Sequence, residues 1–341
     1  MKVNYICREI SNMNATGQIV RRKGITKGFM ENGIKLNLIQ LSEEFNDFAY
    51  LKTLTNEINS SEMSITIIEG FEFAYYLKGY ISLRNCLVDI CDSRILVSAI
   101  DPKNRSNPIF RKARRFLKLI RNGIRLRILS RQCHGFIYIS TRDSLSDRRF
   151  LRTLLKVTIL PNGIQQATTQ GIAFDPEGDF LVTGNWTYAP NLEMLSRSID
   201  ILSDENIRNG RSLRIVGPNL DVSKIESQTW IKYVGWVENP SEIYRKIFCL
   251  LAPLQYGGGV KNKVLDAIAH GIPVFGTKEA FASIPPELLA GSFFVDELSD
   301  FTKTLPFKME EIRIRLETSY KCTAKYSWKN EVGNFLKEIN P

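Results

Sequence analysis

The chain has 341 residues, of which 43% are hydrophobic and 24% charged, a composition typical of globular proteins and long enough for two domains. The net charge of +10 predicts an anionic partner such as a nucleotide, an acidic lipid or a nucleic acid. Six scattered cysteines without a C-x-x-C pair, and only two histidines, exclude a zinc pattern and predict buried thiols in a reducing, cytoplasmic compartment. The N-terminus is charged too early for a signal peptide, and no apolar run approaches the ~20 residues that span a bilayer.

In the first half of the chain, predicted strands alternate with predicted helices. Strands are expected over 1–8, 34–41, 64–68, 87–90 and 135–140, with helices up to about residue 32 and over 48–58. This alternation predicts a parallel α/β sheet with right-handed crossovers. The stretch 157–163, with Pro161 and Gly163, predicts a turn at a domain boundary.

Residues 103–131 form a basic stretch, and no acidic residue lies between Asp101 and Asp143. Apolar residues recur through it at helical spacing, which predicts a basic amphipathic helix. Such a helix suits an anionic membrane surface. A helix packed in a domain needs the same apolar stripe, so the sequence leaves both interpretations open. No base-stacking array or helix-turn-helix pattern accompanies the charge, and no nucleic-acid partner is expected.

The second half repeats the alternation, with strands expected over 180–183, 213–217 and 231–237 and a helix over 190–201. Its most informative run is LLAPLQYGGGVKNKVLDAIAHGIPVFGT, residues 250–277. A short buried strand, the turn Gly257, Gly258 and Gly259, a helix, and a further strand after Gly271 follow one another.

A glycine-rich turn at a helix N-terminus leaves backbone N–H groups at the positive end of the helix dipole, where they bind anions. Lys261 and Lys263 add two ammonium donors, and Asp266, one turn further on, can accept hydrogen bonds from a ribose diol. Glycine turns and first-turn lysines are often purely structural. The complete run nevertheless fits a nucleoside diphosphate.

This run resembles the donor-binding signature of GT-B glycosyltransferases, close to the retaining nucleotide-sugar family known as glycosyl transferases group 1, with the pattern G-x-x-x-K-x-x-E-A-x-A-x-G-x-P-V. The resemblance implies that Lys261 and Lys263 contact the donor diphosphate and that Asp266 replaces the glutamate that holds the ribose. A second family glutamate stands eight residues earlier. Here that position is Gly258, so the resemblance does not extend to the sugar contact of that glutamate.

Other segments resemble the same family and imply further site residues. Gly17 lies in the first βα loop, where the family has a glycine loop facing the donor phosphates. Asp92 follows the strand that approaches the reaction centre, and is a candidate sugar contact or base unless it only caps the next segment. The run LVTGNWTYAPN resembles the family element in which Gly184 and Asn185 approach the donor. Trp236 is a candidate for flanking the nucleotide base, with core packing as its alternative.

The resemblance implies an α/β, GT-B architecture in which two Rossmann-like domains with parallel sheets face a central cleft. The expected parts are an acceptor-binding domain (1–162), a nucleotide-sugar-binding domain (163–325) and a last helix returning to the first domain (326–341).

The implied function is transfer of a sugar from a nucleotide-diphosphate donor to a saccharide or lipid-linked saccharide in surface-polysaccharide assembly. The resemblance implies a retaining mechanism. Metal independence is expected because no D-x-D motif is present and the lysines can neutralise the diphosphate. Lys261 and Asp92 are the expected catalytic residues, and no cofactor is expected. Two alternatives remain open: a nucleotide-sugar epimerase of the same fold, and a non-catalytic basic adaptor for membranes or nucleic acid.

Overall fold

The computed structural model describes residues 2–9, 17–41, 64–99, 108–151, 156–165, 171–225, 228–295 and 309–339. The helix expected over 48–58 lies outside these residues, as does the part of the basic stretch that precedes residue 108. The chain divides into two compact units. Unit 1 comprises residues 1–163 and 328–341, and unit 2 comprises residues 164–327. The boundaries expected from the sequence lie one and two residues away from these.

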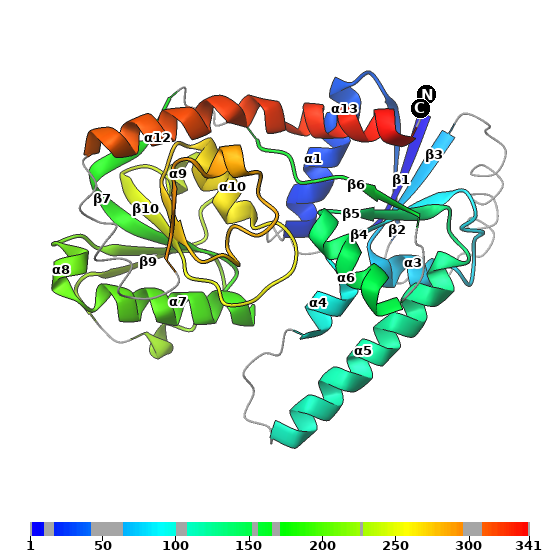
Figure 1. The fold of residues 1–341 in the computed structure, drawn as a ribbon, viewed down its shortest axis with the longest axis horizontal. Coiled ribbons are helices and arrows are strands. Elements are labelled where there is room, and N and C mark those ends of the chain that lie inside the picture. Colours follow the sequence, from blue (N-terminus) through cyan, green and yellow to red (C-terminus); the bar gives the residue numbers. More distant parts are fainter. Residues whose placement is uncertain are drawn as a thin grey trace. The chain divides into compact units, whose positions relative to one another are not determined.

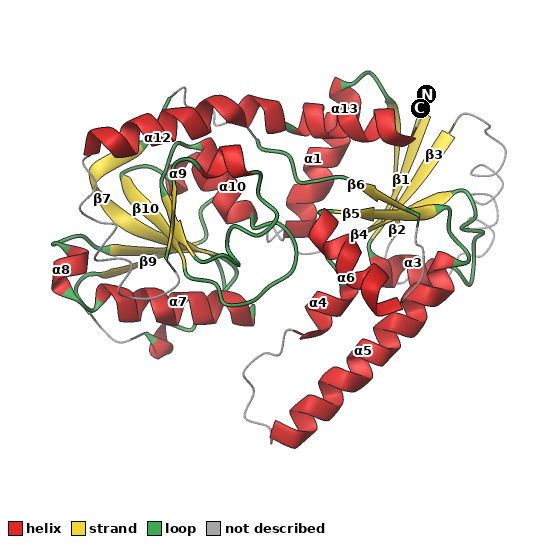
Figure 2. Cartoon of the chain, viewed as in Figure 1, coloured by secondary structure: helices red, strands yellow, loops and turns green. Residues whose placement is uncertain are grey.

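Unit 1 is a parallel sheet of six strands in the order β2-β1-β3-β4-β5-β6, covered by helices on both faces (Figures 1 and 2). Its strands are β1 (Lys2–Arg8), β2 (Lys35–Leu41), β3 (Ser64–Glu69), β4 (Cys86–Cys91), β5 (Gly135–Tyr138) and β6 (Val157–Ile159). Its helices are α1 (Gly17–Glu31), α3 (Phe71–Leu77), α4 (Arg94–Ala99), α5 (Pro108–Ser130), α6 (Thr141–Leu151) and α13 (Trp328–Ile339).

Two hydrophobic cores form because alternate residues of each strand point to opposite faces of the sheet. Tyr5 shares one core with Phe29 of α1 and Trp328 of α13. Its neighbour Ile6 faces the other core, with Phe71 of α3 and residues of α5. The C-terminal helix α13 therefore belongs to unit 1 and packs against α1.

Unit 2 is a second parallel sheet of six strands, in the order β12-β11-β10-β7-β8-β9. Its strands are β7 (Phe174–Thr183), β8 (Leu213–Val216), β9 (Ile231–Gly235), β10 (Ile247–Ala252), β11 (Val274–Gly276) and β12 (Ser292–Phe294). Its α-helices are α7 (Ala189–Leu202), α8 (Glu205–Arg208), α9 (Pro240–Ile243), α10 (Asn262–Ala269) and α12 (Met309–Cys322), and its 3-10 helices are Val222–Lys224, Pro286–Leu289 and Thr323–Tyr326.

The central strand of unit 2, β10, is buried along its whole length. Parallel sheets covered on both faces need such continuous apolar strands. Because β7, β10 and β11 are parallel neighbours, the segments that follow them emerge at one edge of the sheet. The glycine turn after β10 and the start of α7 after β7 are two of these segments.

The six cysteines do not all fit the expectation of buried thiols. Cys7, Cys86 and Cys249 are buried, whereas Cys91, Cys133 and Cys322 are half-buried. All six are free. Cys91 ends β4, Cys133 lies in the turn before β5 and Cys322 ends α12, where packing is less complete than in the centre of a sheet.

Candidate functional site

The glycine turn of unit 2 leads from β10 into α10, as expected. Gly259 has a φ of +65°, a backbone conformation that residues with a Cβ rarely adopt. Lys261 is the residue before the helix, and its side chain makes no capping bond to the helix amides. The N-terminus of α10 is therefore not occupied by a capping side chain of its own, which suits the binding of an anion.

Lys263, in the first turn of α10, is directed towards α7 rather than into solvent. Its Nζ donates a hydrogen bond to Oδ1 of Asn191 at 2.8 Å and lies 3.6 Å from Sδ of Met194. Burial and, secondarily, the nearby charge of Lys261 lower the pKa of Lys263 to about 7. The ammonium is thus poorly compensated, and a bound anion would stabilise its charged form.

Asp266 lies one turn further along α10 and is half-buried. Burial raises the pKa of its carboxyl to about 7. Among the described residues, no hydrogen bond or ion pair to this carboxylate is found. A carboxyl whose pKa is raised by partial burial, at a helix next to a glycine turn, is a candidate for binding a ligand's hydroxyl groups.

Lys261 is held beside the glycine turn by acceptors of its own unit. Its Nζ donates to the carbonyl oxygens of Gly258 and Gly259, at 3.0 and 3.1 Å, and lies 3.5 Å from Oε1 of Glu279. The sequence prediction did not include Glu279. It follows β11, and the rule that neighbouring parallel strands end at the same edge could have placed it beside the turn after β10.

Gly184, at the end of β7, packs against the start of α7. A Cβ at this position would come within 2.6 Å of Nδ2 of Asn191. The glycine therefore leaves room for the Asn191 amide group, which forms two hydrogen bonds. Asn191 donates to the carbonyl of Asn185 at 2.8 Å and accepts from Lys263. The Asn185 side chain accepts from the backbone and hydroxyl of Thr187. Asn191 is the residue here that the sequence prediction missed, although it belongs to the resembling run.

Trp236 follows β9 and is 49% exposed. Core packing, the alternative weighed for it, is wrong. A large exposed aromatic ring is consistent with stacking on a ligand, but the described contacts do not bring it against Lys263 or Asp266.

Gly17 and Asp92 belong to unit 1. Gly17 is the exposed first residue of α1, and residues 10–16 before it are outside the described part of the chain. Asp92 is half-buried after β4, where its Oδ1 accepts from the Cys91 thiol at 3.6 Å and its carbonyl accepts from the Arg94 guanidinium. The next helix, α4, is capped by the hydroxyl of Ser93, which accepts from the amide of Leu96.

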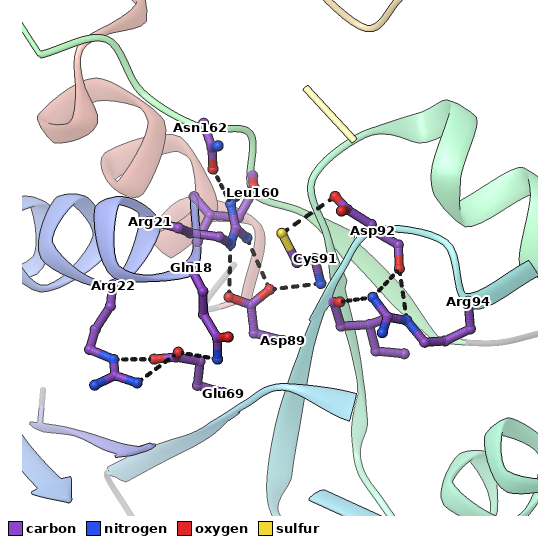
Figure 3. Close-up of polar contacts among 11 residues, drawn as sticks. Gln18, Arg21, Arg22, Glu69, Asp89, Cys91, Asp92, Arg94, Leu160 and Asn162 are labelled. Atoms are coloured by element: carbon purple, nitrogen blue, oxygen red, sulfur yellow. Dashed lines mark hydrogen bonds and ion pairs between the residues drawn. The ribbon is translucent and has the colours of Figure 1, made fainter. Parts of the chain in front are cut away.

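A buried network of ion pairs, absent from the sequence prediction, connects α1 to the ends of β3 and β4 (Figure 3). Arg21 pairs with both carboxylate oxygens of Asp89, at 2.9 and 3.0 Å. It also donates to the carbonyl of Leu160 and to Oδ1 of Asn162. Next to it, Arg22 pairs with Glu69. Because both charges of each pair are buried, loss of one side chain would leave its partner's charge unpaired. The network therefore holds α1 on the sheet.

The basic helix α5 has two apolar faces. Leu126 and Leu129 are fully buried against the rest of unit 1. Phe116, Leu117 and Ile124, by contrast, are 62%, 65% and 55% exposed. The following basic residues of α5 and the turn after it are also exposed: Lys112, Arg114, Arg115, Arg121, Arg127 and Arg131. The first half of α5 extends away from the other helices of its unit (Figure 1).

A domain helix needs only one apolar stripe, and the buried residues supply it. The exposed stripe therefore remains unexplained by packing within unit 1. No helix in the described part of the chain has the length and hydrophobicity to cross a membrane. Within the same residues, no group of three or more His, Cys, Asp and Glu side chains is arranged to hold a metal ion.

A family model and several solved structures match this chain. Residues 177–301, which include the glycine turn and α10, match the family model described as "Glycosyl transferases group 1". No curated protein sequence matches the chain. The predicted resemblance is confirmed by this match, which covers the segment with the donor-binding signature.

Solved structures match along almost the whole chain. WaaG, a glycosyltransferase involved in lipopolysaccharide biosynthesis, is 12% identical with a TM-score of 0.66, and the match covers 100% of both chains. Sucrose-phosphate synthase from Thermosynechococcus elongatus is 10% identical with a TM-score of 0.69, covering 98% of each chain. HepE from Anabaena, solved with UDP and glucose, is 10% identical with a TM-score of 0.66, covering 99% of this chain and 98% of its own. The predicted α/β GT-B fold is thereby confirmed.

Proposed function

We propose that this chain, a glycosyltransferase of the GT-B fold, transfers a sugar from a nucleoside-diphosphate donor bound by unit 2 to a saccharide or lipid-linked saccharide acceptor. The observation that carries the proposal is the set of charged residues in and beside the first turns of α10. Lys261 and Lys263 lie at the N-terminus of α10 and the half-buried carboxyl of Asp266 lies one turn further on, within the segment that matches group 1 glycosyltransferases. HepE was solved with UDP and glucose, which supports a uridine donor as the first to test.

The proposed catalytic contribution is the stabilisation of negative charge on the leaving diphosphate. When the bond between the sugar and the diphosphate breaks, negative charge grows on the departing phosphate. Lys261, Lys263 and the first amides of α10 stabilise that charge in the transition state, which is usually the largest contribution to catalysis. Asp266 accepts hydrogen bonds from the ribose hydroxyls and orients the nucleoside. The two lysines take the role of a divalent cation, so the reaction is proposed to be metal-independent and, from the family resemblance, retaining.

Asp92 is proposed to contact the transferred sugar or to act as a base, since it follows β4 at the edge of the unit 1 sheet where such folds place ligand groups. Gly17 is proposed to contribute backbone amides to the donor phosphates, and Trp236 to flank the base. The matches described above are to glycosyltransferases and lend no support to an epimerase or to a non-catalytic adaptor.

Turnover with and without Lys261 tests the enzymatic proposal. Release of nucleoside diphosphate from UDP-, GDP- and ADP-sugars is measured with oligosaccharide acceptors. We expect release from one donor class, and a loss of about 100-fold or more in Lys261→Ala, because a charge-assisted contact to the leaving group is removed. Lys321→Ala, an exposed lysine of α12, is the control and should keep full activity. Equal activity in Lys261→Ala would contradict the proposed role.

The exposed apolar stripe of α5 is proposed to dock on an anionic membrane on the cytoplasmic face. Phe116, Leu117, Ile120 and Ile124 would insert at the level of the lipid headgroups, and the basic residues beside them would face anionic lipid. Each basic residue near such a surface contributes about 1 kcal/mol. The acceptor is then proposed to be lipid-linked and part of surface-polysaccharide assembly. WaaG, which acts in lipopolysaccharide biosynthesis, supports this direction.

Vesicle sedimentation tests the membrane proposal. We expect binding to vesicles containing anionic phosphatidylglycerol, weakening as salt rises, and little binding to neutral phosphatidylcholine. Phe116→Ser/Leu117→Ser/Ile120→Ser should weaken the binding at least about tenfold, since three exposed apolar side chains are lost. Met30→Ser/Ile314→Ser, which removes exposed apolar side chains from α1 and α12, should bind like the wild type. Undiminished binding of the triple variant would rule out the α5 stripe as the docking surface.

A further inference from the structure

A tyrosine-lined pocket in unit 1 is separate from every residue assigned to donor binding. It has a volume of about 510 Å³ and lies between the end of α3 and the side of α5. Tyr75, Tyr76 and Tyr80 line it. Small-molecule sites in proteins have volumes of about 300–1,000 Å³, so the pocket is large enough for a sugar residue. We call it the tyrosine pocket.

Two of its rings are arranged as an exposed aromatic corner. The ring centroids of Tyr76 and Tyr80 lie 5.0 Å apart with the planes tilted by 45°. The residues are 43% and 37% exposed, so the rings remain accessible. The face of an aromatic ring carries partial negative charge. The axial C–H groups of a pyranose carry partial positive charge, so a sugar stacks on such a face.

The third tyrosine, Tyr75, has a different position. The ammonium of Lys78 lies 4.6 Å from its ring centroid, and the guanidinium carbon of Arg125 lies 4.8 Å from it. These two cation–π contacts restrain the Tyr75 ring in the lining of the pocket. Arg125, from α5, also pairs with Glu72 of α3, so the pocket wall is fastened across two helices.

The charged side chains that line the tyrosine pocket, Glu72, Lys78 and Arg125, are of mixed sign. Glu72 offsets Arg125, which leaves only Lys78 as a surplus charge among the residues that line the pocket. A phosphate would also have to approach the Glu72 carboxylate. A neutral polyol suits the same groups better, because carboxylate and guanidinium form directed hydrogen bonds to hydroxyl groups at the rim of an aromatic platform.

We infer that the tyrosine pocket is a saccharide-binding site, in which Tyr76 and Tyr80 stack on a neutral pyranose residue while Glu72 and Arg125 bind its hydroxyls. Sugar binding at this pocket stands on its own geometry. The further step, that the sugar belongs to the acceptor glycan, rests on the proposed function, because unit 1 is the expected acceptor-binding unit.

Saturation-transfer NMR on the full chain, without nucleotide, tests the inference. The probes are methyl β-D-glucopyranoside, methyl α-D-mannopyranoside and N-acetylglucosamine. We expect at least one to receive saturation from the protein. In Tyr76→Ala/Tyr80→Ala the affinity should fall about fivefold to tenfold, because the stacking platform is removed. Tyr76→Phe/Tyr80→Phe keeps the rings and should retain most of the signal.

Two further arms separate this site from others. Lys263→Ala alters the donor site and should leave the sugar signal unchanged, whereas loss of the signal there would place the sugar in unit 2 and overturn the inference. Calorimetric binding of UDP should be equal in the wild type and in Tyr76→Ala/Tyr80→Ala, so failure of the donor proposal is visible separately.

Absence of signal from all three sugars, or an undiminished signal in the double alanine variant, would overturn the inference. Loss of vesicle binding in that variant without any sugar signal would instead identify a lipid headgroup as the ligand.

Discussion

Lys263→Ala is expected to weaken the binding of a nucleoside diphosphate about 10- to 100-fold. The Lys263 ammonium is half-buried, bound to Asn191 and next to Lys261, so an anion gains a charge-assisted hydrogen bond that solvent does not replace. The variant should stay folded, since it removes a charge that burial already disfavours. Isothermal titration calorimetry with UDP gives the affinity, and thermal unfolding checks the fold.

The pH dependence of the same binding gives a second readout of Lys263. Its pKa of about 7 means that the free protein loses this ammonium charge as pH rises from 7 to 9, and bound diphosphate favours the charged form. Affinity in the wild type should therefore fall over this range, with proton uptake on binding. In Lys263→Ala the fall should be absent or much reduced. Parallel profiles for the two proteins would contradict the assignment.

Asp89→Asn is expected to destabilise unit 1 by about 3–5 kcal/mol. The substitution leaves the buried Arg21 guanidinium without its countercharge, and an unpaired buried charge is the costly case. Urea unfolding followed by circular dichroism measures the loss. The exposed pair of Lys27 and Glu31 provides the matched control, because Glu31→Gln should change stability by less than about 1 kcal/mol.

A double variant separates the lost charge from lost packing. In Arg21→Met/Asp89→Leu both charges are gone, and apolar replacements of buried ion pairs are often neutral or stabilising. The double variant should therefore be more stable than Asp89→Asn, although the carbonyl of Leu160 and Oδ1 of Asn162 lose a donor. If Asp89→Asn were as stable as the wild type, the buried pair would not hold α1 on the sheet.

Local sequence patterns predicted the fold well, and the main residues proposed for the donor site lie in one of the elements predicted in this way. The strand, glycine turn, helix and strand over 250–277 are contiguous, so Lys261, Lys263 and Asp266 were identifiable from spacing and resemblance alone. The hydrogen-bond partners of these residues could not be identified in this way. Asn191 is 72 residues from Lys263, and such a pair is brought together only by the order of strands in the sheet.

Two further features could not be predicted from the sequence: the ion-pair network of unit 1 and the exposed apolar face of helix α5. Arg21 and Asp89 are 68 residues apart, and two consecutive arginines on a predicted helix are more typical of a solvated face than of a buried one. In α5 the apolar periodicity was visible. A single pattern of apolar spacing does not reveal that one set of residues faces the core and another faces solvent.

The most direct test of donor binding by α10 is calorimetric titration of the wild type with UDP, GDP, ADP and CMP at pH 7, repeated on Asp266→Ala. We expect micromolar binding of one nucleoside diphosphate, weakened at least about tenfold in the variant, because the hydrogen-bond acceptor for the ribose hydroxyls is lost. The absence of binding to every one of these nucleotides would contradict the central claim that α10 of unit 2 holds the donor.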